Sequence, residues 1–262
     1  MNARTTLVVA SLLAAGCAAH GTVRVKVALA KGLAERGQKD AAFEAADAAC
    51  REAPDDGTAR AIRGALLTSR GLLDEAEADL KDAVRLESRL PEAHAALAVL
   101  HERRQRPDEA EAEHRRAAEL APRDARYANN LGYALLVHGK PAEALPVLRQ
   151  AARLDPMSPR IRNNLGFTYA RLSDYPRAAH EFALGGTPAE AQNNLGFAYE
   201  RAGNLAQARA HYEEGLRLDP DLAAARQNLS RVSAGPQANA SKPAGEPSTV
   251  LANVAHPGGS QP

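Results

Sequence analysis

The sequence predicts an all-α solenoid in which about six helix hairpins stack and a capping helix closes the C-terminal end. The main observation is an internal repeat, because Leu131-Gly132, Leu165-Gly166 and Leu195-Gly196 recur at steps of 34 and 30 residues. A fixed period in this range is typical of stacked repeats, each too small to bury its own apolar face. Composition agrees, since 45% hydrophobic residues with 4% aromatics describe helices packed by Ala and Leu.

The clearest repeat covers residues 125–158 and contains the pattern of one hairpin. Small or apolar residues stand at Leu131, Gly132, Leu135, Ala144, Leu148 and Ala151. Pro156 closes the repeat. These positions resemble the tetratricopeptide repeat, which consists of two antiparallel helices, and the resemblance covers about residues 23–222. We expect the two helices to approach closely at Gly132, Ala144 and Ala151, with Gly139 in the turn between them.

The remaining elements follow the same register. Hairpins are predicted over 23–56, 57–90, 91–124, 125–158, 159–188 and 189–222, with a capping helix over 223–232. The fifth hairpin is four residues short, and the sixth is predicted to begin with a capping box of Thr187, Pro188 and Glu190. Pro146 conflicts with a helix that begins at Pro141, so the sequence predicts a kink or a delayed start there.

The N-terminal segment looks like a targeting signal. Residues 1–16 carry one charge, Arg4, before an apolar run, which predicts a signal peptide too short to span a bilayer. The ending Leu13-Ala14-Ala15-Gly16-Cys17 resembles a bacterial lipobox. This resemblance implies palmitate on Cys17, a lipidated linker over 17–22 and an outer-membrane lipoprotein that faces the periplasm. The alternative is ordinary secretion with cleavage near Ala18 or Ala19, which would give a soluble periplasmic protein.

The C-terminal segment and the second cysteine carry less information. Residues 233–262 are rich in Pro and Gly, which predicts a disordered tail, although Thr249-Val250-Leu251 is apolar enough to dock on a partner. Lipidation of Cys17 would leave Cys50 without an intramolecular partner, so no disulfide framework is predicted. We expect Cys50 to be a small packing residue.

Charge and motifs argue against catalysis and nucleic-acid binding. The chain has 33 basic and 32 acidic residues, so it has no bulk attraction for nucleic acid. The sequence contains no phosphate loop, nucleophile elbow or HExxH motif, and we expect neither an enzyme nor a cofactor. His94, His101 and His114 occupy positions usually filled by large packing residues, which favours half-buried histidines over a metal site.

The family resemblance also implies a binding surface, because specific positions of each first helix face the concave groove. In the last three repeats these positions hold two asparagines and an aromatic residue: Asn129, Asn130 and Tyr133; Asn163, Asn164 and Phe167; Asn193, Asn194 and Phe197. An amide both donates and accepts, so a ladder of amides can bind the backbone of an extended peptide. The alternative is that the amides cap turns or join adjacent repeats while the rings pack.

Basic side chains extend this predicted site, which lies in the C-terminal half. Arg126, Arg160, Arg171 and Arg201 frame the groove and are suited to bind carboxylates. None of the first three repeats has the paired asparagines, and the second and third carry Ala61-Ile62 and Ala95-Ala96 in their place.

The combination of lipobox, repeats and length resembles the outer-membrane pilotin lipoproteins of type IV pili and the assembly lipoproteins of Flp (tight-adherence) pili. The local match includes residues 93–99 and 129–132. The resemblance implies a non-catalytic protein-binding scaffold that assists assembly of an envelope machine such as a pilus secretin. The alternatives are a periplasmic adaptor that recruits peptidoglycan hydrolases or proteases and, more distantly, the substrate-binding arm of an enzyme complex.

Overall fold

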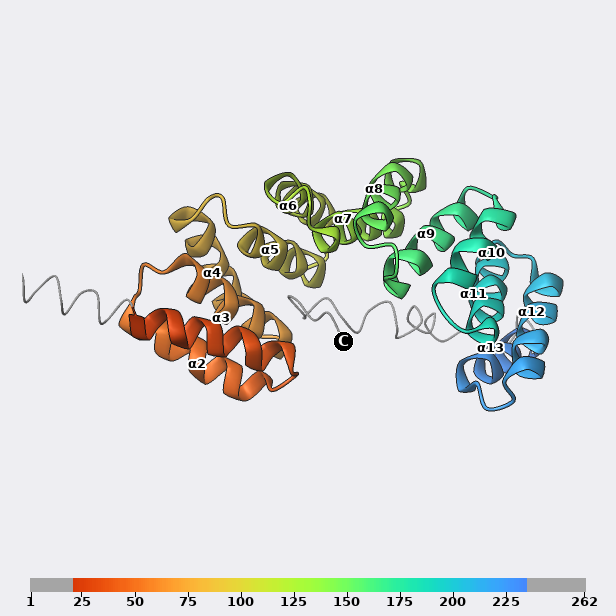
Figure 1. Cartoon of the computed structure of the whole chain (residues 1–262), viewed down its shortest axis with the longest axis horizontal. Helices are drawn as coiled ribbons and strands as arrows, with labels where there is room; N and C mark the ends of the chain where they lie inside the picture. Colours follow the sequence, from red (N-terminus) through yellow and green to blue (C-terminus); the bar gives the residue numbers. More distant parts are fainter. Residues whose placement is uncertain (1–20, 235–262) are drawn as a thin grey trace, which may run out of the picture. The chain divides into compact units, whose positions relative to one another are not determined.

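The computed structural model describes residues 21–234, and every regular element in this range is an α-helix. The predicted fold class, a solenoid of stacked helix hairpins, is confirmed (Figure 1). The predicted signal peptide, Cys17 and the tail beyond residue 234 lie outside the described residues. The described helices belong to two compact units, residues 21–120 and residues 121–234.

The first unit contains three hairpins. A helix over 21–35 precedes five others: α2 (Lys39–Glu52), α3 (Gly57–Arg70), α4 (Leu73–Leu86), α5 (Pro91–Arg103) and α6 (Pro107–Leu120). Helices α3 and α4 pair, as do α5 and α6, and α3 also contacts α5. First helices of consecutive repeats are therefore neighbours, as stacking requires.

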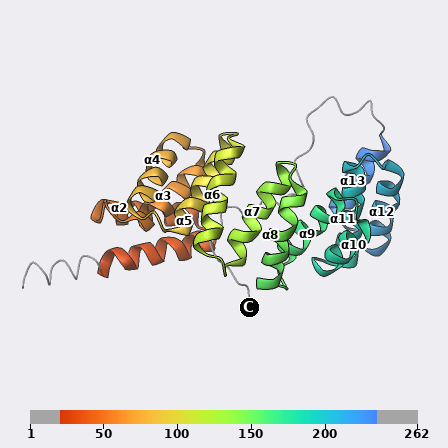
Figure 2. The same cartoon turned by 90° about the horizontal axis from the view of Figure 1, so that it is seen from above.

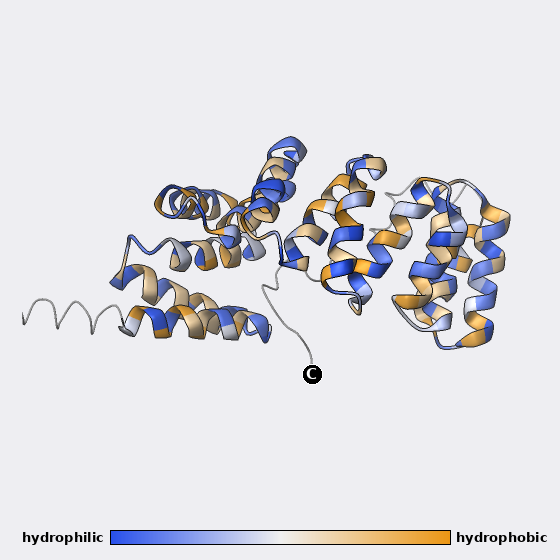
Figure 3. Ribbon diagram, turned by 45° about the horizontal axis from the view of Figure 1, so that its top comes forward, coloured by the Kyte–Doolittle hydropathy of each residue, from blue (hydrophilic) through white to orange (hydrophobic). Residues whose placement is uncertain are grey.

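The second unit contains three further hairpins and the predicted capping helix (Figure 2). Its helices are α7 (Ala125–Val137), α8 (Pro141–Leu154), α9 (Pro159–Arg171), α10 (Tyr175–Leu184), α11 (Pro188–Arg201), α12 (Leu205–Leu218) and α13 (Ala223–Ser233). The first helices α7, α9, α11 and α13 contact one another in sequence order. Figure 3 shows polar and apolar segments alternating along these helices, as expected for helices with one buried face.

In each repeat of the second unit, a glycine marks the closest approach of the two helices, as predicted. A Cβ added to Gly132 would lie 2.4 Å from Leu148, and one added to Gly166 would lie 2.6 Å from Phe182. Gly196 stands in the same relation to Tyr212, at 2.7 Å. Leu148, Ala144 and Ala151 are fully buried beside Gly132. The large residue of the second helix therefore occupies the space that the glycine leaves.

The turns inside the hairpins need a left-handed residue. Gly139 has φ +76°, which confirms its predicted place in the turn, and three other repeats also use glycine there. The third and fifth repeats lack this glycine and use Gln105 (φ 57°) and Ser173 (φ 64°) instead. Gln105 and Ser173 therefore adopt a left-handed backbone conformation, which costs a non-glycine residue about 1 kcal/mol.

Two local predictions have opposite outcomes. The capping box is confirmed, because Thr187 accepts from the backbone N–H of Glu190 while the Glu190 carboxylate accepts from that of Thr187. The delayed start of the helix around Pro146 is wrong, since α8 begins at Pro141 and continues through Pro146. Pro146 and Ala142, whose carbonyl loses its helical partner, are both exposed, so water can reach that carbonyl.

Cys50 packs as predicted. Its side chain is 5% exposed and lies in a cluster with Val23, Ala49 and Ala59. Burial raises the pKa of its thiol to about 11. Cys50 is therefore a protonated, inert packing residue at neutral pH.

Candidate functional site

The paired asparagines of the second unit join neighbouring repeats to each other. The second asparagine of a pair, or Asn228 of the capping helix, donates through Nδ2 to Oδ1 of the first asparagine in the preceding repeat: Asn164 to Asn129 (2.9 Å), Asn194 to Asn163 (3.2 Å) and Asn228 to Asn193 (2.9 Å). We call these three contacts the amide pairs. Asn228, on the capping helix, was missed in the sequence analysis, although it lies 34 residues after Asn194 and precedes Leu229 as Asn194 precedes Leu195.

Burial corrects the predicted open ladder. Asn129, Asn164 and Asn193 are 4%, 2% and 6% exposed, so the expectation that these three side chains are open to a peptide is wrong. The physical reason is that stacking places each amide against its neighbour, where a hydrogen bond offsets the cost of burial. The alternative of bonding between adjacent repeats is the arrangement that the structure contains.

The other three asparagines are half-buried, and their environments differ. Asn163 accepts a hydrogen bond from Asn194 and also donates to the carbonyl of Gly185, at 3.3 Å. The second bond joins α9 to the residue that follows α10 in the shortened fifth repeat. For the Asn130 side chain, residues 21–234 supply no hydrogen-bond partner.

The predicted aromatic residues form a strip along the first helices. Tyr133, Phe167 and Phe197, which we call the aromatic strip, are all half-buried. The Phe167 ring lies edge-on to Phe197 at 5.9 Å and edge-on to Phe182 at 4.8 Å between centroids. These rings therefore pack against one another across α9 and α11 while part of their surface remains accessible.

The four predicted arginines differ in their environment. Arg126 binds its near neighbour Asp124, with 2.6 Å between Nη2 and Oδ2. Arg160 is half-buried, and this burial lowers its pKa. Arg171 and Arg201 are exposed at the ends of α9 and α11, and no ion pair holds either of them within the described part of the chain. Only these two are fully available to an external carboxylate.

A polar cluster holds the capping helix onto the last hairpin. Tyr212 donates its hydroxyl to Glu200 at 2.6 Å, and Arg231 of α13 donates to both oxygens of Glu200 at 2.8 Å. Burial alone would raise the pKa of Glu200, but the hydrogen bonds from Arg231 and Tyr212 lower it below its usual value. Glu200, which lies at a position of the first helix that the resemblance assigns to the groove, therefore makes a structural contact instead.

Polar side chains between the two helices of a repeat form pairs that recur at the same spacing. In four repeats, a side chain in the first turns of the first helix meets one 19 residues later on the second helix: Arg60 with Asp79 (3.2 Å), His94 with Glu113 (2.6 Å), Arg162 with Glu181 (2.9 Å) and Gln192 with His211 (2.7 Å). This recurrence indicates a structural function for these groups.

The three histidines of the third repeat are buried, more deeply than the half-burial predicted. His94 lies between two acceptors, Glu113 and the Ser88 carbonyl at 3.1 Å, and the bond to Glu113 raises its pKa. Burial lowers the pKa of His101. Within residues 21–234, no group of three or more potential ligands is placed to hold a metal ion.

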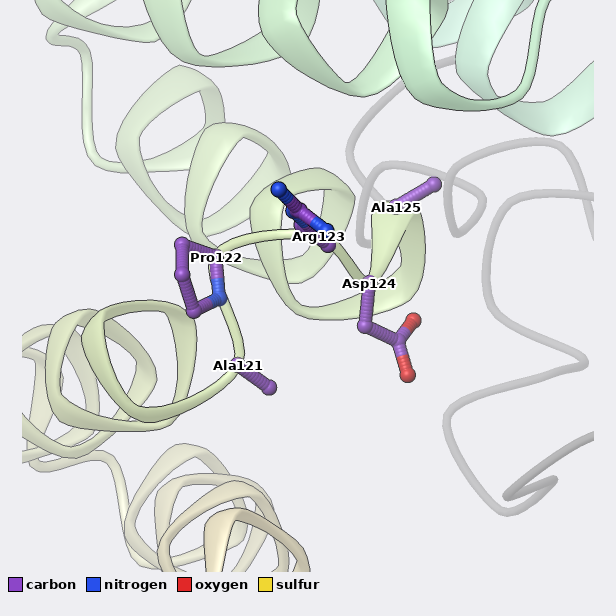
Figure 4. Close-up of a pocket in the computed structure, with 5 residues that line it drawn as sticks. All are labelled: Ala121, Pro122, Arg123, Asp124 and Ala125. Atoms are coloured by element: carbon purple, nitrogen blue, oxygen red, sulfur yellow. The ribbon is translucent and has the colours of Figure 1, made fainter.

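A shallow hollow lies at the turn before α7, and Figure 4 shows the five residues that line it, 121–125. Its acidic side chain, Asp124, caps α7 by accepting from the Arg126 backbone N–H at 2.9 Å. The hollow contains none of the asparagines or rings described above. The residues of the predicted peptide-binding site therefore do not line this hollow.

Comparison with solved structures places this architecture among helix-hairpin solenoids. PilF of Pseudomonas aeruginosa is 19% identical with a TM-score of 0.64, and the match covers 82% of this chain and 99% of PilF. YrrB, described as a TPR protein with an unusual peptide-binding site, is 23% identical with a TM-score of 0.56, over 72% of this chain and 99% of YrrB. TTC0263 of Thermus thermophilus is 20% identical with a TM-score of 0.51, over 81% of this chain and all of TTC0263.

Sequence profiles define the family. Models described as the tetratricopeptide repeat match residues 70–125, 95–159, 129–189 and 189–222. The chain therefore belongs to the tetratricopeptide-repeat proteins, which are protein-binding scaffolds. No curated protein sequence matches the chain. Among the described residues, no helix has the length and hydropathy that a bilayer crossing needs.

Proposed function

We propose that this protein is a non-catalytic scaffold, tethered to the outer membrane through a lipid on Cys17, that binds an extended peptide along α7, α9 and α11. In this role it assists the assembly of an envelope machine such as a pilus secretin. The lipobox supports the tether, and the repeat fold supports the scaffold. The fold is shared with PilF and with YrrB, and the peptide-binding site described for YrrB supports peptide binding as the function of the scaffold.

The observation that carries the binding proposal is the aromatic strip beside two unpaired arginines. Phe167 and Arg171 lie one turn apart on α9, as do Phe197 and Arg201 on α11. The ring surfaces suit apolar side chains, and the guanidinium groups suit carboxylates. The bound peptide therefore alternates apolar and acidic residues, and Asn130 is the amide best placed to bind its backbone.

Site-specific photocrosslinking tests the binding surface. A photoreactive amino acid at Phe167 should crosslink to an envelope protein in cells, whereas the same group at Leu184, exposed at the end of α10, should not. Arg171→Glu with Arg201→Glu should reduce the crosslink about tenfold or more. Arg209→Glu, at an exposed position of a second helix, is the matched control. Equal crosslinking from Phe167 and Leu184 would contradict the site.

Fractionation tests the tether separately. Cys17→Ser should move the protein from the membrane fraction to the soluble periplasmic fraction and abolish palmitate labelling. A wild-type protein without label, together with unchanged fractionation of the variant, would contradict the lipid anchor.

A further inference from the structure

The helix over 21–35 has one face buried in the first hairpin. Val23 belongs to a buried cluster with Ala49 and Ala59, and Ala30 and Ala34 belong to a second cluster. Lys26 forms an ion pair with Glu52 at the edge of this face. The helix is therefore held onto α2 and α3 in a defined rotation, which determines what its opposite face presents.

The opposite face is apolar and unusually exposed. Val25 and Leu29 are 67% and 53% exposed, and Ala28 is exposed between them. Gly32 continues the same stripe, and a Cβ added there would meet nothing within 4 Å. The spacing i, i+3, i+4 and i+7 places these four residues on one side of the helix.

Basic side chains border this stripe. Arg24 and Lys31 lie on the outward side of the helix, Arg36 follows its last residue, and no ion pair within the described residues holds any of the three. Glu35 is the acidic group on the same side, so the face has an excess of positive charge. A short helix with an apolar stripe and basic borders is typical of segments that lie in the interface of an anionic membrane.

We propose that this face, defined by Val25, Ala28, Leu29 and Gly32 with their basic neighbours, docks on an anionic phospholipid surface. The proposal rests on the lipid anchor at Cys17. Residue 21, the first described residue, lies in this helix four residues after Cys17, and four residues span at most about 14 Å. An anchored helix is therefore held within reach of the lipid headgroups.

Charge favours this occupant over a second copy of the chain. Two copies that met through this face would bring their rows of Arg24, Lys31 and Arg36 together, and like charges across an interface are unfavourable. An anionic bilayer neutralises the same charges, and Val25 and Leu29 can be buried at the boundary between its headgroups and acyl chains. The contact orients the first hairpin relative to the membrane, which a lipid chain alone does not do.

Vesicle flotation of unacylated full-length mature protein, residues 17–262 with Cys17→Ser, tests the face without the anchor. We expect binding to phosphatidylcholine vesicles that contain about a quarter phosphatidylglycerol, and weaker binding to pure phosphatidylcholine. Val25→Asp with Leu29→Asp, or Arg24→Glu with Lys31→Glu, should lower partitioning at least about tenfold. Met157→Asp with Leu184→Asp, at exposed apolar positions elsewhere, should leave it unchanged.

Thermal melts should show that all variants fold, because the substituted side chains point away from the core. Partitioning that is equal in the parent protein and both face variants would overturn the proposal. It would also be overturned by a dimer in the parent protein that the Asp variant converts to monomers, since the face would then bind a second copy. Either result would leave the Cys17→Ser fractionation, and with it the lipid anchor, unaffected.

Discussion

Asn164 donates its side-chain amide to Asn129 Oδ1 at 2.9 Å, and this buried bond joins α9 to α7 across two repeats. Both side chains are less than 5% exposed, so neither can turn to water when the other is removed. Asparagine, whose amide suits peptide binding, therefore connects neighbouring repeats at this position. Stability measurements can distinguish the structural role from the binding role.

Asn164→Ala should lower the free energy of unfolding by about 1–3 kcal/mol, because it leaves Asn129 buried without its donor. Asn130→Ala should change it by less than about 0.5 kcal/mol, since Asn130 is half-buried and retains access to water. Chemical denaturation measures both. Equal, small effects would show that the Asn164 bond contributes nothing to stability.

Gly166→Ala should destabilise the second unit by about 1–3 kcal/mol, because the new Cβ would lie 2.6 Å from the Phe182 ring. Gly166→Leu should unfold the neighbouring hairpins. Gly32→Ala is the matched control in a helix with open space, where alanine should stabilise by about 0.5–1 kcal/mol. Thermal melts that rank the two alanine variants in the opposite order would contradict the close approach.

Tyr212→Phe should cost about 1.5–3 kcal/mol, because it removes a 2.6 Å hydrogen bond to the ionised Glu200. Tyr175→Phe keeps the ring that stacks on Tyr199 at 4.1 Å and should be nearly neutral. Hydrogen exchange should show faster opening of α13 in the Tyr212 variant, since Glu200 also holds Arg231. Unchanged protection of α13 would mean that the capping helix is held by its apolar contacts alone.

The stability that His94 contributes should depend on pH. Both partners of its ring, Glu113 and the Ser88 carbonyl, are acceptors, so both nitrogens donate only in the protonated form. Because its pKa is raised in the folded state, this stabilisation is complete below the unfolded pKa of about 6.5 and is lost as pH rises through the folded value. Glu113→Gln should therefore lower the melting temperature more at about pH 5.5 than at about pH 8.5.

His101→Leu provides the contrasting variant. Burial lowers the pKa of His101, and its Nδ1 has no hydrogen-bond partner among the described residues. The unfolded chain therefore binds a proton more readily, and the wild type loses stability as pH falls below about 6.5. His101→Leu should stabilise the protein, and more at about pH 5.5 than at about pH 8.5. A pH-independent effect of both variants would contradict the assigned protonation states.

Local patterns in the sequence were sufficient to predict the fold. The repeat at Leu131-Gly132 and its copies required stacked hairpins, because one hairpin cannot bury its apolar face alone. Gly139 in the turn and the Thr187 capping box depend on residues one to three positions apart, and both were predicted correctly. The delayed helix start near Pro146 was wrong, because the cost of a missing helical bond depends on whether water can reach the free carbonyl.

The environment of the candidate site was decided by tertiary structure. The sequence placed Asn129 and Asn164 on first helices, but whether an amide faces solvent or another amide depends on how residues 35 positions apart are stacked. The same holds for Glu200, whose groove-facing position is used by Arg231 of the capping helix, 31 residues later. Hydrophobic periodicity determines which face of a helix is buried, whereas the pairing of polar groups is set by the distance between helices.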